Sequence, residues 1–359
     1  MIRIFFTALF IAIANLYAAD PEISEGEKSL PMQGEAFKFD GSDAFMIVPL
    51  DAEENIPWVW YAPTLKGLPS NDEKWMFEKF LENGIAIAGI DIGESYGSPK
   101  GRATYSSFYD HLVEERKFRN KPCLLVRSRG GLMLYNWAVE NPDSVAGVAG
   151  IYPVCNIISY PGIAKASGAY GLTPEELEAE LVKHNPIDRL EPLAKAKVPI
   201  LHLHGDADKL VPLDANSAEL GMRYAQLGGS VEIDVIEGQG HNMWEGWFKS
   251  EKLTDFTIAC ALGEEFILRN PVGGQEHQVH LEGNLEGGVM AIGGETTGWV
   301  LNFKEGGEEK SIEVDMSAID LADIFGGKDV KIAGEIISKQ YTTRGTVLVL
   351  KAAKIQVDQ

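Results

Sequence analysis

The sequence contains little cysteine. Only Cys123, Cys155 and Cys260 occur in 359 residues, so at most one disulfide can form within the chain. Cys123 opens a predicted strand and Cys155 follows the end of the next parallel strand, which would place these two at opposite edges of a sheet. We therefore expect no disulfide, and we expect all three cysteines to be small buried apolar residues.

Positive charge is also scarce. The chain has 32 Lys and Arg residues against 53 Asp and Glu residues, which gives a formal net charge of −21. Such a charge repels nucleic acid and anionic membrane surfaces, so neither is expected as a partner. The apolar fraction of 45% is ordinary for a chain with packed cores, which excludes wholesale disorder.

Long apolar runs are absent beyond the N-terminus. Residues 2–18 place Arg3 before a nearly continuous apolar run, which ends in the small residues Ala18 and Ala19. This arrangement is typical of a secretory signal peptide, and the run is short for a membrane-spanning helix. We predict a signal peptide at 1–19 and a secreted or periplasmic chain without stable membrane insertion. A retained N-terminal anchor is the alternative.

Residues 20–263 alternate strand-like and helix-like segments, which predicts an α/β domain with a mostly parallel sheet. Short apolar runs predict strands at 57–62, 85–91, 123–127, 145–152, 198–204 and 231–236. Several runs are apolar on both faces, as a parallel sheet covered by helices on both sides requires. Apolar residues at helical spacing predict helices at 72–83, 104–118, 130–140, 215–227 and 249–262. Weaker alternation predicts antiparallel edge strands within 21–53.

One connection within this domain, at about 154–196, is unusually long. Long connections in compact domains tend to be lids or binding elements, so we expect an inserted lid here. Within it, Thr173 is predicted to cap a helix whose first turn contains Pro174.

Residues 264–359 have a different texture, in which glycines separate short alternating runs such as VMAIGG at 289–294, GWVLNF, SIEVDM and VKIAGEI. Five or six strands with a short helical segment at 318–325 resemble a small OB-like barrel, and a small sandwich is the alternative. The 15 acidic and 9 basic residues of 265–359 argue against the nucleic-acid role that some OB folds have.

Three segments carry residues suited to catalysis. In CLLVRSRGGL, a buried strand leads through Ser128 into a helix that begins with Gly130 and Gly131. Small residues at such a strained turn let the strand and the helix approach each other, and the turn exposes the serine hydroxyl.

The other two segments supply a carboxylate and an imidazole. In VPILHLHGDADKLVP, Asp206 and Asp208 follow a buried strand, and in VEIDVIEGQGHNMW, His241 follows the last strand of the domain. A carboxylate is needed to hold a catalytic histidine in one tautomer and to stabilise it when protonated. Asp206 is the more typical turn residue of the pair.

The chain order Ser128, Asp208, His241 resembles the catalytic triad of the α/β-hydrolase superfamily. The turn around Ser128 resembles the nucleophile elbow of this superfamily, whose usual pattern is GxSxG, with Val126 in place of the first glycine. This turn is called the elbow below. The likeness covers residues 55–262 and is closest to the dienelactone-hydrolase and prolyl-oligopeptidase-like branch. It implies the α/β-hydrolase fold, Ser128 as nucleophile, Asp208 as acid and His241 as general base.

The same resemblance implies an oxyanion hole. One donor would be the backbone N–H of Arg129, the residue after the nucleophile. The other would come from Ala62-Pro63-Thr64, which stands where the family usually has His-Gly-X. Pro63 has no N–H to donate, which points to Thr64.

Four further residues are candidates for binding substrate. Arg127 flanks the nucleophile, where it either recognises an anionic or hydroxylated substrate or braces the elbow. Glu94 and Tyr96 follow a strand that ends at the same sheet edge, where an ordinary turn is the alternative. Trp244 lies just past His241 and either forms an aromatic wall or belongs to the core.

Three other functions compete. A peptidase or amidase of the prolyl-oligopeptidase type would use the same triad, but such enzymes usually carry a propeller, for which residues 20–55 are too few. His202 and His204 resemble the HxHxD start of some metallohydrolase sites, but a metal site leaves Ser128 and His241 unexplained. A binding protein without activity would be expected to lack a member of the triad.

We therefore predict an exported serine hydrolase that cleaves a carboxylic ester without a metal or other cofactor. Its expected substrate is a small-molecule or carbohydrate ester, and ester-decorated polysaccharides fit an exported chain. The sequence leaves open the acyl and alcohol parts, the preference for ester over amide, the role of the C-terminal domain and the oligomeric state.

Overall fold

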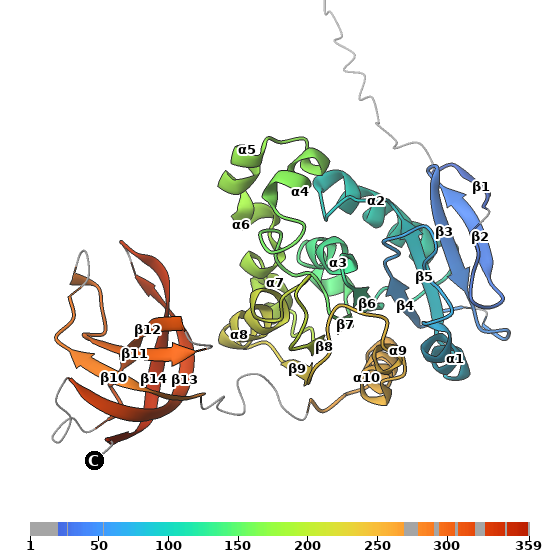
Figure 1. Ribbon diagram of the computed structural model, residues 1–359. Coiled ribbons are helices and arrows are strands. Elements are labelled where there is room, and N and C mark those ends of the chain that lie inside the picture. Colours follow the sequence, from blue (N-terminus) through green and yellow to red (C-terminus); the bar gives the residue numbers. More distant parts are fainter. Residues whose placement is uncertain are drawn as a thin grey trace, which may run out of the picture.

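The computed structural model describes residues 21–26, 28–52, 54–268, 279–290, 294–305, 308–319, 327–341 and 343–357. They form an α/β unit up to residue 268 and a β-barrel from residue 279 (Figure 1). The predicted signal peptide at 1–19 and most of the predicted helical segment at 318–325 lie outside the described residues.

The α/β unit is built on one nine-stranded sheet in the order β1-β2-β3-β5-β4-β6-β7-β8-β9. The strands are β1 (Ile23–Glu25), β2 (Glu35–Phe39), β3 (Ser42–Ile47), β4 (Trp58–Tyr61), β5 (Ala86–Asp91), β6 (Cys123–Arg127), β7 (Gly147–Ile151), β8 (Ile200–Gly205) and β9 (Val231–Ile236). The first three strands are antiparallel edge strands, and β4 to β9 run parallel to one another. All six strands predicted between 57 and 236 are present, and so are the edge strands predicted within 21–53.

Helices connect these strands. They are α1 (Lys74–Glu82), α2 (Pro99–Asp110), η1 (His111–Glu115), α3 (Gly130–Ala138), η2 (Pro142–Ser144), α4 (Ile163–Tyr170), α5 (Pro174–Ala179), α6 (Leu181–His184), η3 (Pro186–Asp188), α7 (Glu191–Lys195), η4 (Asp214–Ala218), α8 (Glu219–Gln226), α9 (Glu245–Phe248) and α10 (Glu251–Leu262). The helix predicted at 104–118 begins earlier, at Pro99. Its start is set by Ser98, whose side chain accepts a hydrogen bond from the N–H of Gly101.

The sheet is buried on both faces, as its apolar runs predict. Along β4, Trp58 and Trp60 belong to one core together with α2, α3 and α8, whereas Val59 and Tyr61 belong to the other core together with α1 and α10. This alternation follows from the two-residue period of a strand. The sheet therefore holds the loops at its carboxyl edge on a rigid base.

The long insertion forms helices α4 to α7 after β7 (Figure 1). The predicted cap at Thr173 is present as a capping box, in which Thr173 and Glu176 each bond the other's backbone N–H. A small apolar core joins this insertion to Tyr96 and Leu132, at the same end of the sheet as the loops described below.

The C-terminal unit is a closed barrel of five strands in the order β10-β11-β12-β14-β13. The strands are β10 (Val279–Gly287), β11 (Trp299–Glu305), β12 (Glu308–Asp315), β13 (Lys328–Tyr341) and β14 (Gly345–Val357). They enclose a core that includes Leu285, Leu301 and Leu350. The predicted barrel is confirmed, and the alternative of a sandwich is wrong. Residues 289 and 290, which are the first two of the run at 289–294, do not form a strand. The chain turns at Gly288, which has a positive φ of 73°.

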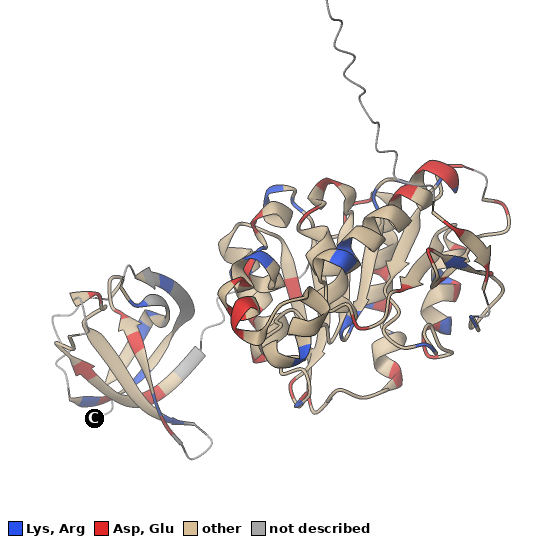
Figure 2. Ribbon diagram, turned by 90° about the horizontal axis from the view of Figure 1, so that it is seen from above, with Lys and Arg blue, Asp and Glu red and all other residues tan. Residues whose placement is uncertain are grey.

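Acidic and basic side chains are spread over both units and do not gather in one segment (Figure 2). The three cysteines are free and buried, as predicted. Among the residues that the structure describes, no helix has the length and apolarity needed to cross a membrane.

Candidate active site

Ser128 lies in a tight turn between β6 and α3. Its φ of 49° is in the left-handed region, which is strained for a residue with a side chain. The turn is held because Ser128 donates its N–H to the Ile151 carbonyl and its own carbonyl accepts from Val154 N–H at 2.8 Å. A Cβ on Gly131 would lie 2.3 Å from the carbonyl oxygen of Val154, so this position requires glycine. The sequence pattern that indicated an elbow thus has a steric cause.

Ser128, His241 and Asp208 form one hydrogen-bonded row. Ser128 Oγ lies 2.8 Å from His241 Nε2, and His241 Nδ1 lies 2.8 Å from Asp208 Oδ2. Each residue follows a different parallel strand, namely β6, β8 or β9, and those strands end at the same edge of the sheet. The three residues that sequence analysis singled out are therefore brought together, although up to 113 positions separate them in the chain.

The carboxylate of Asp208 is buried but well supplied with donors. Its Oδ1 accepts from the N–H groups of Leu210 at 3.0 Å and Val211 at 2.9 Å, and its Oδ2 faces His241. Burial by itself would raise the pKa of Asp208, but the surrounding donors outweigh it and hold the pKa well below its usual value. Asp208 is thus ionised next to His241 at neutral pH. Asp206 is exposed and accepts from the N–H of Gly238, which fits its predicted place in a turn.

The two predicted oxyanion donors lie beside the elbow. A Cβ on Gly130 would contact the carbonyl oxygen of Ala62 at 3.2 Å and the side chain of Thr64 at 3.7 Å, so the loop after β4 packs against the start of α3. The Arg129 side chain reaches the Thr64 carbonyl at 3.3 Å. Within the described parts of the chain, the backbone N–H groups of Arg129 and Thr64 have no hydrogen-bond acceptor. Free backbone N–H donors are what a developing oxyanion needs.

The guanidinium of Arg127 is engaged inside the protein. It pairs with Glu73, and Glu73 also accepts from the hydroxyl of Tyr61 at 2.8 Å. It lies over the ring of Phe248 at 4.9 Å and contacts the sulfur of Met243, which is two residues after His241. Of the two roles predicted for Arg127, these contacts are those of a brace, because they tie the elbow to the histidine loop.

Glu94 and Arg129 form a partly exposed ion pair close to Ser128. Tyr96, two residues further on, is 4% exposed, and burial together with the nearby Glu94 raises its pKa to about 12. The backbone carbonyl of Tyr96 accepts from the hydroxyl of Tyr170 in the insertion, at 2.7 Å. Glu94 thus presents a charge near the serine, whereas Tyr96 is mainly packed against the insertion.

Trp244 is 42% exposed, so it is not a core residue. Its ring packs edge-on against Trp247, Trp247 packs in the same way against Tyr152, and Tyr152 lies 4.3 Å from the ring of His241. This aromatic row supports the histidine from one side. Tyr152 was not among the predicted site residues, although its position directly after β7 could have indicated it.

His202 and His204, the residues of the metallohydrolase alternative, are fully buried. Both nitrogens of each ring have hydrogen-bond partners within the protein, namely Tyr135, Ser217 and the Val211 carbonyl. No cluster of three or more potential metal ligands occurs among the described residues. The side chains that form one hydrogen-bonded row at this sheet edge are Ser128, His241 and Asp208.

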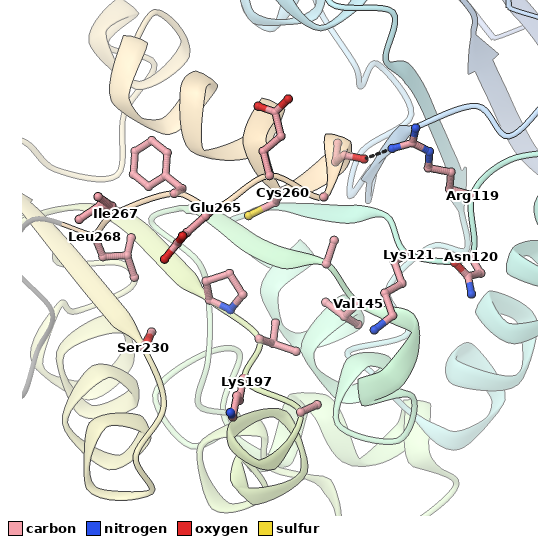
Figure 3. A pocket seen from close by; sticks show the side chains of 18 residues that line it. Arg119, Asn120, Lys121, Val145, Lys197, Ser230, Cys260, Glu265, Ile267 and Leu268 are labelled. Atoms are coloured by element: carbon pink, nitrogen blue, oxygen red, sulfur yellow. Dashed lines mark hydrogen bonds between the residues drawn. The ribbon is translucent and has the colours of Figure 1, made fainter.

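A separate cavity of about 630 Å³ lies at the opposite edge of the sheet (Figure 3). It is lined by the segments that precede β6, β7, β8 and β9 and by the chain after α10, and it includes Arg119, Lys197 and Glu265. No residue of the triad lines it.

Comparisons with known proteins bear on the fold. No known protein family and no curated protein matches the sequence. Among solved structures, the acylaminoacyl peptidase of Pyrococcus horikoshii aligns at 16% identity with a TM-score of 0.51, over 67% of this chain and 43% of that one. The chain has the α/β-hydrolase fold. The fold class predicted from the elbow and the order of the triad is confirmed.

Two further α/β-hydrolase structures are similar. Est1E from Butyrivibrio proteoclasticus aligns at 18% identity with a TM-score of 0.49, over 64% of this chain and all of that one. An S-formylglutathione hydrolase from Agrobacterium tumefaciens aligns at 16% identity with a TM-score of 0.46, over 68% of this chain and 96% of that one. By contrast, the aligned part of this chain spans less than half the length of the Pyrococcus peptidase.

Proposed function

We propose that this α/β hydrolase is an exported serine hydrolase that cleaves a carboxylic ester through an acyl-enzyme. The observation that carries the proposal is the unbroken row from Ser128 through His241 to Asp208, with the serine on a strained turn. A serine hydroxyl is a weak nucleophile by itself, and an adjacent imidazole activates it by accepting its proton.

The first half of the reaction forms the acyl-enzyme. Ser128 Oγ attacks the carbonyl carbon of the ester while His241 Nε2 takes the hydroxyl proton, and the carbonyl oxygen becomes an oxyanion. The N–H groups of Arg129 and Thr64 would stabilise this oxyanion, and Asp208 stabilises the imidazolium. The tetrahedral intermediate then expels the alcohol, which leaves with the proton from His241.

The second half returns the enzyme to its starting state. A water molecule gives one proton to His241 Nε2 and attacks the acyl carbon. The second tetrahedral intermediate releases the carboxylic acid, and Ser128 Oγ recovers the proton from His241. One ester bond and one water molecule are consumed, so no redox partner or cofactor takes part.

An ester is favoured over an amide as the scissile bond. The peptidase in the comparisons is more than twice as long as the aligned region, so its likeness covers only part of it. The fold is equally compatible with a peptidase or amidase, which is the second candidate because the Pyrococcus protein is an acylaminoacyl peptidase.

The surroundings of the serine suggest a substrate with polar and apolar parts. The charged pair of Arg129 and Glu94 lies on one side, and the exposed Trp244 follows His241 on another. A pair of charged side chains can bind hydroxyl groups, and an indole can stack on a sugar or an aryl ring. These features and the predicted export support an acylated carbohydrate as substrate.

A substrate screen tests the proposal. The whole chain, expressed with its own N-terminus and recovered from the exported fraction, is assayed with short nitrophenyl esters, acylated sugars, uronic-acid esters and aminoacyl amides. Hydrolysis of an ester that disappears in Ser128→Ala supports the proposal. Turnover of amides alone favours the peptidase, and ester turnover that persists in Ser128→Ala overturns the mechanism. Retention of the chain in the cytoplasm contradicts the export.

A further inference from the structure

A chain of buried hydrogen bonds runs behind the triad acid. It joins Tyr135 on α3, His202 and His204 on β8, and Ser217 on η4. The Tyr135 hydroxyl lies 2.7 Å from His202 Nε2, Ser217 Oγ lies 3.0 Å from His202 Nδ1 and 2.8 Å from His204 Nδ1, and His204 Nε2 lies 2.8 Å from the Val211 carbonyl oxygen. The two imidazoles, the hydroxyl of Ser217 and the ring of Tyr135 are all fully buried.

The partners determine where the protons of His204 and Ser217 lie while the rings are neutral. The carbonyl oxygen of Val211 can only accept, so His204 carries its proton on Nε2 and donates it there. The other nitrogen, Nδ1, is then an acceptor, and it takes the hydroxyl proton of Ser217. Ser217 has a single proton, which is thereby committed to His204.

The same logic extends to His202 and Tyr135. Because the Ser217 proton is committed, its oxygen accepts from His202 Nδ1–H, and His202 Nε2 accepts from the Tyr135 hydroxyl. Burial, and then the neighbouring His204, lower the pKa of His202 to about 3, so this ring is neutral. Every donor in the chain thus points from Tyr135 toward Val211.

The last link of this chain reaches the triad. Val211 accepts from His204 with its carbonyl and donates its N–H to Asp208 Oδ1. His204 Nε2 also lies 3.6 Å from Asp208 Oδ2, which is the oxygen that bonds His241. The Nε2–H of His204 therefore holds the loop that orients the Asp208 carboxylate. The partial positive charge of this N–H also lies near Asp208 Oδ2.

We propose that His204 is a positioning residue for the triad acid, and that Ser217 locks it in the Nε2–H tautomer. This proposal rests on the proposed serine mechanism, in which Asp208 orients His241. The role differs from filling the core, because a shape-conserving residue without an N–H at this place would pack but would leave the Val211 carbonyl unpaired. The chain of hydrogen bonds also connects α3, the helix that follows Ser128, to the loop that contains Asp208 and Val211.

Proton NMR tests the proposal without depending on substrate. The proton shared by His241 Nδ1 and Asp208 gives a strongly deshielded resonance, which is assigned by its loss in Asp208→Ala. We expect Ser217→Ala and His204→Leu to shift or broaden this resonance, and His204→Gln, whose amide can still donate to the Val211 carbonyl, to restore it in part. Thr257→Val, which removes another buried hydroxyl with a carbonyl partner, is the control that should leave the resonance in place.

Kinetics with the best ester from the screen give the second readout. We expect kcat to fall about 10-fold in Ser217→Ala and about 100-fold in His204→Leu, with KM changed less than about 2-fold and with His204→Gln in between. An unchanged resonance in Ser217→Ala, together with an unchanged kcat, overturns the positioning role even if the melting temperature drops. If His204→Leu fails to fold, Ser217→Ala and His204→Gln decide alone. If the wild type cleaves no ester, the proposed function fails, while the resonance still tests the position of Asp208.

Discussion

Each unit of the chain buries a carboxylate among donors, but the partners of the two carboxylates differ. In the barrel, Glu313 accepts from the Tyr341 hydroxyl at 3.0 Å and from the N–H of Thr297 at 3.3 Å, and it pairs with Arg344. In the α/β unit, Asp208 accepts from two backbone N–H groups and from His241.

In both cases burial would raise the carboxyl pKa, and the donors lower it instead. The two networks differ in the side chain that pairs with the carboxylate. A guanidinium keeps its proton, so Arg344 transfers no proton from Glu313 to another group. An imidazole has a second nitrogen that can take a proton from a third group, and in His241 that nitrogen lies 2.8 Å from Ser128 Oγ. A buried carboxylate with a lowered pKa is thus part of an ion-paired network in one unit and, in the proposed mechanism, part of the reaction chemistry in the other.

The largest effect should come from removing the nucleophile. Ser128→Ala is expected to lower kcat/KM for an ester by about 10,000-fold or more, because no other group can form the acyl-enzyme. The melting temperature should not fall. Ser107→Ala on the surface of α2 is the matched control with full activity. Residual turnover within about 10-fold of the wild type would show that another residue acts as nucleophile.

The next largest effect separates the two carboxylates. Asp208→Asn should lower kcat by about 1,000-fold to 10,000-fold, because an amide cannot stabilise the imidazolium and favours the wrong tautomer. Glu313→Gln should leave kcat unchanged. Steady-state kinetics of both purified variants check this, and a comparable loss of activity in Glu313→Gln would contradict the comparison.

A smaller effect should appear in the stability of the barrel. Arg344→Gln leaves the buried Glu313 without its cation and is expected to cost about 1 to 3 kcal/mol of unfolding free energy. Hydrogen exchange of the strands, followed by mass spectrometry, locates the effect. Faster exchange confined to the barrel is expected, with esterase activity preserved. Equal protection in the variant and the wild type would mean that Arg344 contributes nothing.

Acidification should weaken both units for the same reason. The folded pKa values of Asp208 and Glu313 are lowered, so the stability that each adds is present above the ordinary carboxyl pKa and is lost as pH falls through the lowered value. Unfolding free energies should therefore decrease as the pH is lowered from about 5 toward about 2. Asp208→Asn should flatten this dependence in the α/β unit and Glu313→Gln in the barrel, and identical curves for wild type and variants would refute the assignment.

The smallest effect concerns the rim of the site. Trp244→Ala removes an exposed ring that follows the catalytic histidine, and it should raise KM for an aryl or sugar ester by about 3-fold to 10-fold. The kcat for a small acetyl ester should stay the same, because the ring contacts Trp247 rather than His241. A matched change at Leu227, an exposed apolar residue just after α8, should alter neither constant. An equal KM for all esters in Trp244→Ala would remove this residue from the binding surface.

Much of the sheet could be predicted from local sequence. Strands that are apolar on both faces, such as those predicted at 123–127 and 198–204, indicate a parallel sheet, because such strands must be buried on both sides. The turn at Ser128 could also be predicted, since a Cβ at position 131 would lie only 2.3 Å from the Val154 carbonyl oxygen and glycine is therefore required there. Two local features were not predicted from the apolar pattern. The N-cap Ser98 starts α2 at Pro99, and the turn at Gly288 keeps residues 289 and 290 out of a strand.

The supporting residues of the site were harder to predict. Glu73 lies 54 positions before Arg127, and nothing in its local sequence indicates that the two will pair. The His202 and His204 pair was noticed as an HxHxD pattern, but the pattern by itself could not distinguish metal ligands from hydrogen-bonded core residues. Their partners Tyr135 and Ser217 come from other elements, which only the folded chain brings to β8.

The sequence by itself determined the type of fold, the strained position of Ser128 and the chain order of the candidate triad. These properties depend on short-range patterns of apolar residues and glycine, which act within a few residues of each other. Tertiary structure decided which side chains share protons and charges: Arg127 with Glu73, His202 with Tyr135, and Glu313 with Arg344. Hydrogen bonds and ion pairs act over about 3 Å, so residues far apart in sequence can form them only after packing has placed their elements side by side.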